Sequence, residues 1–298
     1  MEIITLIEDS KHDEKLIEEF GLSLLIKTNG KNILFDTGSS GNFIKNAKML
    51  GMELQDIDFV VISHAHYDHS GGLKAFLQIN DKSKVFLCES ADGDYYSNTV
   101  TKLPYFLNIL IYPLVHNSAY FSKYIGVDKT IFKNYSDRIE FIKSFKEIDK
   151  NIFAITDIIK TRPLAKGNKF LLSMQGDKLK HDEFKHELIL TIKEDDGLVI
   201  FTGCGHSGLL NMVETVKNCF KDDNIKGIVG GFHLKFQPRK DSLAGKRKDI
   251  EFIAKELIRH NAAKVYTGHC TGNKAYTILK SIMKDRLDRI YTGNKIQL

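Results

Sequence analysis

The chain has 298 residues, of which 42% are hydrophobic and 27% are charged; this is typical of a globular protein and excludes disorder over any large part. Its formal net charge of +5 is a mild excess that helps to attract anionic small molecules, whereas nucleic-acid binders usually concentrate more positive charge. No apolar stretch has the length of a membrane-spanning helix, so we expect a cytoplasmic protein without membrane or nucleic-acid partners.

Four cysteines are spread along the chain, and no two of them form a CxxC pair. The acidic residues Glu8 and Asp9 come early and interrupt any apolar segment of the kind that a signal peptide needs. We therefore expect no disulfide framework. The sequence leaves the oligomeric state open.

Short apolar segments and turns alternate at the start of the chain. Asn29-Gly30 is a hairpin-type turn, and Asp36-Thr37-Gly38 ends the apolar segment that follows it. A continuous apolar run with the character of a buried strand then leads into the histidine-rich segment 63–69. We predict strands over Ile3–Ile7, Leu22–Lys27, Ile33–Phe35, Ile57–Ile62 and Lys84–Leu87, and helices over Asn42–Leu50 and around Leu73–Leu77.

Residues 91–136 lose this pattern, and aromatic residues are scattered through them without a strand period. We interpret the segment as a Tyr/Phe-rich insertion that covers part of the active site. An irregular decoration with no role in substrate binding is the alternative. The aromatic residues are Tyr95, Tyr96, Tyr105, Phe106, Tyr112, Tyr120, Phe121 and Tyr124.

The second half returns to strands and helices, and Asp195-Asp196-Gly197 is a hairpin turn within it. The two halves predict an α/β protein in which sheets pack together with helices on their outer faces, as one domain over residues 1–298. We predict strands over Phe170–Met174, Glu187–Ile192, Leu198–Phe201, Ile225–Val229 and Lys264–Thr267, and helices over Leu209–Phe220 and Asp249–Asn261.

The strongest chemical signal is His64-x-His66-x-Asp68-His69, directly after a predicted strand. Alternate side chains of extended backbone point the same way, so His64, His66 and Asp68 can converge, and His69 can turn back as the chain tightens toward Gly71. Imidazole nitrogens and carboxylate oxygens are ligands for zinc, iron or manganese. A buried cluster without such a partner would be costly.

One segment does not complete the coordination of a metal. His206 and His269 each follow a predicted strand and lie beside glycines, which allow sharp turns and close approach of the backbone. Either histidine alone is more often an ordinary polar residue, but beside the first motif each becomes a predicted ligand. His181 and His186 precede a predicted strand and are the runners-up to His206.

Other readings of these residues are weaker. Asp36-Thr37-Gly38 has no second copy, which excludes an aspartic protease, since such enzymes need two carboxylates that share a proton. A cysteine nucleophile at Cys204 or Cys270 is an alternative. Each of these cysteines lies beside a proposed ligand, and metal chemistry explains that placement better.

Together these motifs resemble the metallo-β-lactamase-fold superfamily over most of the chain, the aromatic-rich insertion excepted. HxHxDH is the specific element, and Asp36-Thr37-Gly38 stands where that superfamily has a supporting acidic turn. Three further motifs are similar to a branch labelled dihydropteroate-synthase-like, a label that is a weak guide to substrate. They are Gly203-Cys204-Gly205-His206, Gly230-Gly231-Phe232-His233-Leu234 and Thr267-Gly268-His269-Cys270.

The resemblance implies a four-layer αβ/βα sandwich with the site at the edge between its two sheets. It implies that one or two zinc ions are bound, with iron or manganese as alternatives, and that Asp36 orients a ligand histidine. The implied ligands are His64, His66 and His206 for one metal, and Asp68, His69 and His269 for a second.

The sequence departs from the superfamily at one position. Many members have Thr-Gly-Asp, with an aspartate that bridges two metals, where this chain has Thr202-Gly203-Cys204. Cys204 is a thiolate ligand or, as we favour because free cysteine is so often simply packed, an inert residue. His233 is assigned to catalysis, binding substrate or transferring a proton; a ligand role in place of the aspartate, or no role, are the alternatives.

We therefore expect a metal-dependent hydrolase whose metal-activated hydroxide attacks an ester, thioester or phosphoester-type small-molecule substrate, with an anionic substrate favoured by the net charge. Asp68 and His233 are the predicted catalytic residues. One alternative is a pterin-related transferase or synthase, in which aromatic residues of the insertion stack on a flat heterocycle. The other is a non-catalytic metal-containing binding protein.

Overall fold

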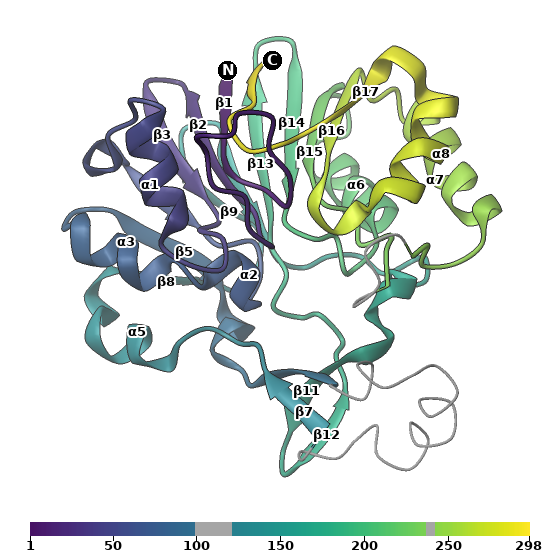
Figure 1. Ribbon diagram of the computed structural model, residues 1–298. Helices are drawn as coiled ribbons and strands as arrows, with labels where there is room; N and C mark the ends of the chain where they lie inside the picture. The colour runs from purple at the N-terminus through teal and green to yellow at the C-terminus, as the bar shows by residue number, and fades with distance from the viewer. Residues whose placement is uncertain (99–120, 237–241) are drawn as a thin grey trace.

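The computed structural model describes residues 1–98, 121–236 and 242–298, and two large β-sheets stand face to face in it (Figure 1). The first sheet takes most of its strands from the N-terminal part of the chain, but its edge strand comes from the C-terminus. In hydrogen-bonded order its strands are β18 (Lys295–Gln297), β1 (Glu2–Ile7), β2 (Ser23–Thr28), β3 (Lys31–Phe35), β4 (Phe59–Val61), β5 (Lys84–Cys88) and β8 (Ile139–Ile142).

The second sheet takes its strands from the later part of the chain, between β9 and β17. Its central strands β14, β15 and β16 run parallel, so their carboxyl ends meet at one edge. In hydrogen-bonded order its strands are β17 (Leu287–Arg289), β16 (Lys264–Thr267), β15 (Ile225–Gly230), β14 (Gly197–Thr202), β13 (Ile189–Glu194), β10 (Ile152–Ile155) and β9 (Lys146–Asp149).

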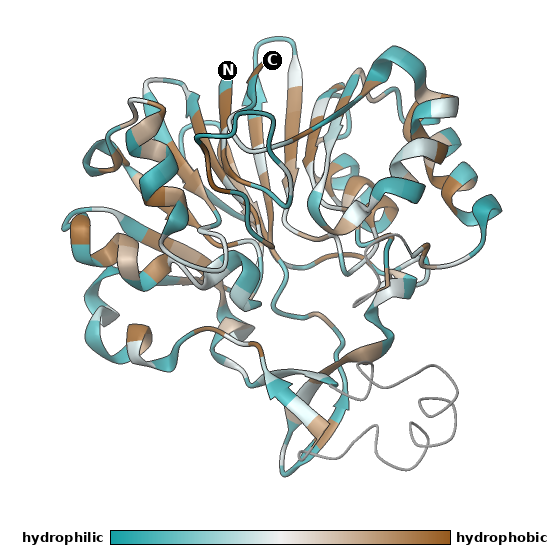
Figure 2. Ribbon diagram, in the orientation of Figure 1, coloured by the Kyte–Doolittle hydropathy of each residue, from teal (hydrophilic) through white to brown (hydrophobic). Residues whose placement is uncertain are grey.

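A buried apolar core joins the two sheets. Phe35 of β3 and Phe201 of β14 are fully buried, and their ring centroids are 5.8 Å apart. Along β14, Val199 and Phe201 belong to this core, whereas Leu198 and Ile200 pack on the opposite face against helices. This period of two explains why β14 reads as a continuous apolar run, since both of its faces are covered (Figure 2).

Helices cover the outer face of each sheet (Figure 1). Apolar residues of α1 and α3 pack on the first sheet, and those of α6, α7 and α8 pack on the second. In the described part of the chain, no helix combines the length and apolarity needed to cross a membrane. The α-helices are α1 (Asn42–Met49), α2 (Tyr67–Ser70), α3 (Leu73–Ile79), α5 (Lys129–Asn134), α6 (Leu209–Cys219), α7 (Arg247–Arg259) and α8 (Asn273–Met283). The 3-10 helices are η1 (Leu54–Asp56), η2 (Glu89–Asp92), η5 (Ser136–Arg138), η6 (Lys166–Phe170), η7 (His269–Thr271) and η8 (Lys284–Arg286).

The predicted α/β class is confirmed, and each predicted strand and helix overlaps an observed one. The hairpin turn at Asn29-Gly30 is present, with both residues at positive φ. The prediction missed the strands β8, β9, β10, β17, β18 and Lys178–His181 (β12), and the helices α2, α5 and α8.

The predicted insertion is partly regular. Its described ends form two strands of a third sheet, which has the order β12 (Lys178–His181), β11 (Leu171–Gln175), β6 (Tyr95–Asn98) and β7 (Ser122–Tyr124). The absence of a strand pattern over 91–136 was therefore a wrong expectation for these two segments. Val127 and Ile131 also belong to the core of the first sheet. Residues 99–120, with Tyr105, Phe106, Tyr112 and Tyr120, lie outside the described residues.

Loops from the two sheets meet at the edge formed by the carboxyl ends of β4 and β14. A Cβ atom on Gly203 would lie 1.9 Å from Ser63 Oγ and 2.9 Å from His64 Nδ1. The Gly203 backbone thus packs directly against side chains of the facing loop, and only glycine allows this approach. The edge is therefore where residues far apart in the sequence come together.

We predict that Gly203→Ala lowers the free energy of unfolding by about 1–3 kcal/mol, because the new methyl group pushes the side chains of Ser63 and His64 away from residue 203. Gly41→Ala is the matched control: its Cβ would be 3.4 Å from the nearest atom, Ala75 Cβ, and its φ is −74°. We expect the control to stay within about 0.5 kcal/mol of the parent. Urea unfolding followed by circular dichroism measures both, and equal effects would contradict this account of the loop contact.

Candidate metal centre

The HxHxDH segment begins after β4 and bends into a short helix. His66 is the extended residue before α2, and Asp68 and His69 lie inside that helix. The sequence analysis expected His69 to turn back, and the helix provides this turn. All four side chains of the motif are buried, with exposed fractions of 0% for His64 and His69, 3% for His66 and 6% for Asp68.

The first donor set is His64, His66 and His206. The ring centroids of His64 and His66 are 4.7 Å apart, and that of His206 lies 4.9 Å from each. The Nε2 atoms of all three are buried and have no hydrogen-bond partner among the described residues. Such a nitrogen costs about 1–3 kcal/mol if it stays unsatisfied, so three together indicate a bound group.

Burial also fixes the protonation state of these rings. It lowers the pKa of His64 and His206 well below the ordinary value and lowers the pKa of His66 to about 3. At neutral pH the three imidazoles are therefore uncharged, and their lone pairs are available to a metal ion.

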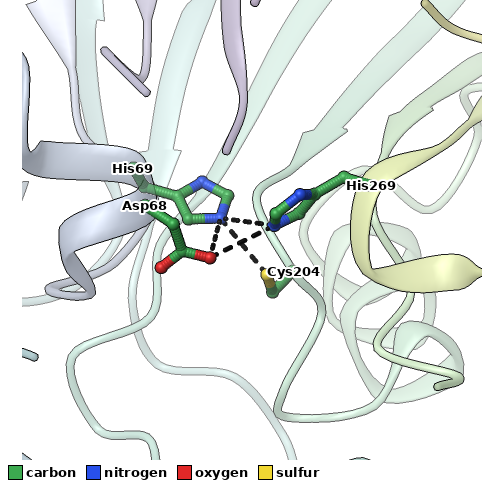
Figure 3. A group of neighbouring side chains, drawn as sticks. All are labelled: Asp68, His69, Cys204 and His269. Atoms are coloured by element: carbon green, nitrogen blue, oxygen red, sulfur yellow. Dashed lines mark hydrogen bonds and ion pairs between the residues drawn. The ribbon is translucent and has the colours of Figure 1, made fainter. Parts of the chain in front are cut away.

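The second donor set is Asp68, His69, Cys204 and His269 (Figure 3). His69 Nε2 lies 3.2 Å from Cys204 Sγ and 3.3 Å from His269 Nε2. Asp68 Oδ2 lies 3.3 Å from His269 Nε2 and 3.7 Å from His69 Nε2. Tetrahedral zinc, with bonds of about 2.0–2.3 Å, separates its ligand atoms by roughly 3.3–3.8 Å, and the distances of 3.2–3.7 Å in this set lie close to that range.

The structure thus places His206 and His269 beside the HxHxDH segment, although each comes from a different loop. His206 follows β14, and His269 opens η7 after β16. The donor types and spacings of both sets fit metal ions. Because burying such donors without a partner is unfavourable, a bound ion would stabilise each set.

Asp36 holds His69, as the sequence analysis expected for this position. Its carboxylate lies 2.6 Å from His69 Nδ1 and accepts hydrogen bonds from both the backbone and the hydroxyl of Ser63, each at 2.7 Å. Asp36 has a φ of +60°, a left-handed conformation that aspartate tolerates better than most residues. With Nδ1 engaged, His69 presents Nε2 to the second donor set.

Asp9 holds His269 in the same way, and the sequence analysis missed it. Asp9 Oδ1 lies 2.6 Å from His269 Nδ1, and the backbone N–H of His269 donates to the neighbouring Glu8. Burial opposes ionisation of Asp9, but His269 and Lys235 outweigh it and lower its pKa to about 2. The available signal was the position of Glu8 and Asp9, which end the first strand as Asp36 ends the third.

His206 is held by two further residues that the sequence analysis missed. Asn168 Oδ1 lies 2.8 Å from His206 Nδ1. The buried carboxylate of Glu187 accepts hydrogen bonds from the backbone N–H groups of His206, at 2.7 Å, and Ser207, at 2.6 Å. These bonds fix the loop that carries His206, so its Nε2 atom points away from its partners.

The two runner-up histidines, His181 and His186, do not join either donor set. His186 Nδ1 accepts a hydrogen bond from the Ala65 backbone at 3.1 Å, and its Nε2 lies 3.0 Å from Asp182 Oδ2. Both ring nitrogens are engaged, so His186 braces the HxHxDH loop. His181 is an exposed residue at the end of β12.

Cys204 lies where the two donor sets meet. Its sulfur lies within 4.8 Å of ligand atoms of His64 and His206, and equally of the other members of the second donor set. Its thiol is free, and its side chain is 2% exposed. This position favours a thiolate ligand over the inert residue that packing statistics had favoured.

His233 lies beside the first donor set, with its ring centroid 4.1 Å from that of His206. Its φ is +46°, an unusual conformation that aims the side chain inward. Neither of its ring nitrogens has a hydrogen-bond partner in residues 1–98, 121–236 and 242–298.

A cavity of about 560 Å³ adjoins the second donor set at His269. It combines aromatic and cationic residues: Lys235 Nζ lies 5.5 Å from the ring centroid of Phe20, and the Arg289 guanidinium lies 4.3 Å from that of Tyr276. It also has acidic walls, and Asp9 pairs with Lys235 at 2.9 Å. The lining residues are Glu8, Asp9, Ser10, Glu18, Glu19, Phe20, Lys235, Phe236, Gly268, His269, Thr271, Gly272, Asn273, Tyr276 and Arg289.

Comparison with known proteins places this arrangement in a family. Residues 16–86 match the family model of the metallo-beta-lactamase superfamily. The uncharacterized protein MJ0448 of Methanocaldococcus jannaschii is 29% identical over 94% of this chain and 94% of its own length. The 7,8-dihydropterin-6-methyl-4-(beta-D-ribofuranosyl)-aminobenzene-5′-phosphate synthase of the same organism is 26% identical over 100% of this chain and 96% of its own length.

A solved structure agrees with these relatives. Tm1679, described as a metal-dependent hydrolase of the beta-lactamase superfamily, superposes with a TM-score of 0.77 at 29% identity, over 100% of this chain and 99% of that one. The protein relatives fit the dihydropteroate-synthase-like branch that the sequence motifs resemble. Its HxHxDH motif, its family-model match and its solved neighbour are all those of the metallo-β-lactamase superfamily, which this chain resembles in fold and site.

Proposed function

We propose that the chain is a metal-dependent hydrolase that cleaves an ester, thioester or phosphoester bond of a small molecule. The observation that carries the proposal is the convergence of two buried donor sets, from loops far apart in the sequence, on one edge between the sheets. The solved relative Tm1679, described as a metal-dependent hydrolase, supports the same reaction class.

The proposal assigns the donor residues to two ion positions. His64, His66 and His206 would hold one ion through Nε2, since those atoms lack other partners in the part of the chain that the structure describes. Asp68, His69 and His269 would hold the second, and Cys204 would place its thiolate between the two ions. Mixed nitrogen, oxygen and sulfur donors favour zinc, with iron or manganese as alternatives.

A bound ion of this kind supplies hydroxide at neutral pH, because it lowers the pKa of coordinated water from 15.7 to about 7. Asp68 would orient the attacking water by accepting a hydrogen bond from it. The pKa of Asp68 is below its ordinary value, because His69 and His269 outweigh the effect of burial, so the carboxylate is ionised for this role.

His233 would act on the substrate. Its ring lies beside the first donor set, and neither ring nitrogen has a hydrogen-bond partner among the residues that the structure describes. An N–H group there can donate to the substrate oxygen that becomes negative when the carbonyl or phosphoryl centre is attacked. The same proton can pass to the leaving group.

The cavity beside His269 would receive the substrate. Its volume of about 560 Å³ suits a small molecule, and Lys235 and Arg289 give it positive charge for an anionic group. Phe20 and Tyr276 offer apolar faces to the rest of the molecule. The described ends of the predicted insertion lie near the metal centre, since Tyr95 packs on His186 at 4.0 Å between centroids, and we propose that the insertion covers part of the active site.

The direct test uses panels of ester, thioester and phosphodiester substrates. We predict that a chelator removes turnover and that added Zn²⁺, Fe²⁺ or Mn²⁺ restores it. His66→Ala is expected to lower kcat/KM by at least about 100-fold, which exceeds the loss typical of residues that only hydrogen-bond to a metal ligand. His12→Ala, on an exposed histidine, is the matched control and keeps full activity. Turnover that persists without metal would contradict the mechanism, and metal binding without turnover on any panel would favour the binding-protein alternative.

A pterin-related transfer or synthesis reaction is the second candidate. It is favoured by the relative named as a dihydropterin synthase, which matches the chain over its whole length, and by the pairing of Phe20 and Tyr276 with cationic groups in the cavity. A flat heterocycle could stack on these rings while a phosphate contacts Lys235 or Arg289.

Titration of the metal-loaded protein with a reduced pterin distinguishes the two candidates. The synthase candidate predicts saturable binding that Tyr276→Ala weakens about tenfold, since a lost ring contact costs about 0.5–1.5 kcal/mol beyond its buried area. Tyr291→Ala, outside the cavity lining, is the control. Absence of binding at millimolar pterin would remove this candidate and leave the hydrolase.

A further inference from the structure

Cys204, a member of the second donor set, also has two neighbouring donors that belong to neither set: His233 and Cys270. Each of the three residues follows one of three parallel neighbouring strands, β14, β15 and β16. Because parallel strands present their carboxyl ends at one edge, the side chains meet although they are up to 66 residues apart. We call them the thiolate set.

Their atoms are close enough to share an ion. One ring nitrogen of His233 and the sulfurs of Cys204 and Cys270 lie within 4.8 Å of one another. The backbone N–H of His233 donates to Cys270 Sγ at 3.2 Å, and Cys270 Sγ lies 3.5 Å from the Cys204 carbonyl oxygen. The three side chains are 2%, 5% and 1% exposed in chain order, so water does not compete for them.

Glycines and backbone conformation keep this arrangement. A Cβ on Gly231 would lie 2.5 Å from Cys270 Sγ, and a Cβ on Gly167 would lie 2.5 Å from His233 Cδ2, so any larger residue would push the donors away. His233 stays in a left-handed conformation that histidine rarely adopts. Both of its ring nitrogens lack partners among the residues described, which indicates that a ligand is missing from the set.

We propose that the thiolate set is a third metal position, selective for a thiophilic divalent cation such as Zn²⁺ or Cd²⁺. Two sulfurs and one imidazole give three protein ligands, with a fourth position left for solvent or substrate. Cys270 and Cys204 lose their thiol protons to solvent when the ion binds. The third position shares Cys204 with the hydrolytic pair and His233 with the proposed contact to substrate, so it goes beyond the proposed function and touches it at these two residues.

The test is a titration of the purified metal-free, reduced protein with Cd²⁺, followed by its thiolate-to-cadmium ultraviolet absorption and by bound metal after dialysis. The parent protein is expected to bind three equivalents of Cd²⁺. Cys270→Ser is expected to bind two and to lose about half of the thiolate absorption, because one of the two sulfurs is gone. Cys219→Ser removes an exposed cysteine and is the matched control with three equivalents.

Two further variants distinguish failure of the third metal position from misfolding of Cys270→Ser and from failure of the proposed hydrolysis. His233→Gln tests the same position without touching sulfur and is expected to lose the third equivalent, so the proposal stays testable if Cys270→Ser does not fold. His66→Ala weakens the hydrolytic pair but is expected to keep the absorption that depends on Cys270, so failure of the proposed hydrolysis is seen separately. Two equivalents in the parent, or an unchanged titration in both Cys270→Ser and His233→Gln, would overturn the third position.

Discussion

The burial of imidazole nitrogens without partners is the constraint on which this structure depends. His64, His66 and His206 are almost fully shielded from water, and their Nε2 atoms meet no hydrogen-bond partner in the described ranges. Burying such groups is unfavourable unless something binds them. The sheets and helices supply enough apolar burial to hold these rings in place, and a cation at the edge between the sheets would satisfy them.

The site is held by partners from distant segments as much as by its own loops. Asp36 fixes His69, and Asp9 fixes His269 from the opposite end of the chain. Asn168 fixes His206. Each contact uses Nδ1 and leaves Nε2 facing the centre, so the ligand rings are oriented before an ion arrives. Cys204 adds a soft sulfur donor among the nitrogen and oxygen donors of the site.

Much of this could be read from the sequence, because the signals were local. The HxHxDH motif and the glycine-flanked His206 and His269 lie directly at strand ends, and each of those strands was predicted. What failed depends on contacts between segments far apart in the sequence. Asp9 and His269 are 260 residues apart, and β18 forms only because its residues pair with β1. Short half-exposed strands such as β9 and β12 carry little apolar pattern, so tertiary contacts define them.

The role of Cys204 was also beyond the sequence. A free cysteine is most often a small buried hydrophobic residue. The sulfur of Cys204 lies among ligand atoms only because the loops after β4, β14 and β16 meet. The most direct test of the central claim is an anomalous difference map of crystals of the metal-loaded protein, recorded on both sides of the absorption edge of the metal. The account predicts one peak among the Nε2 atoms of the first donor set and one within the second, with Cys204 Sγ beside both. Ions bound elsewhere, with His206 and His269 in contact with none, would contradict it.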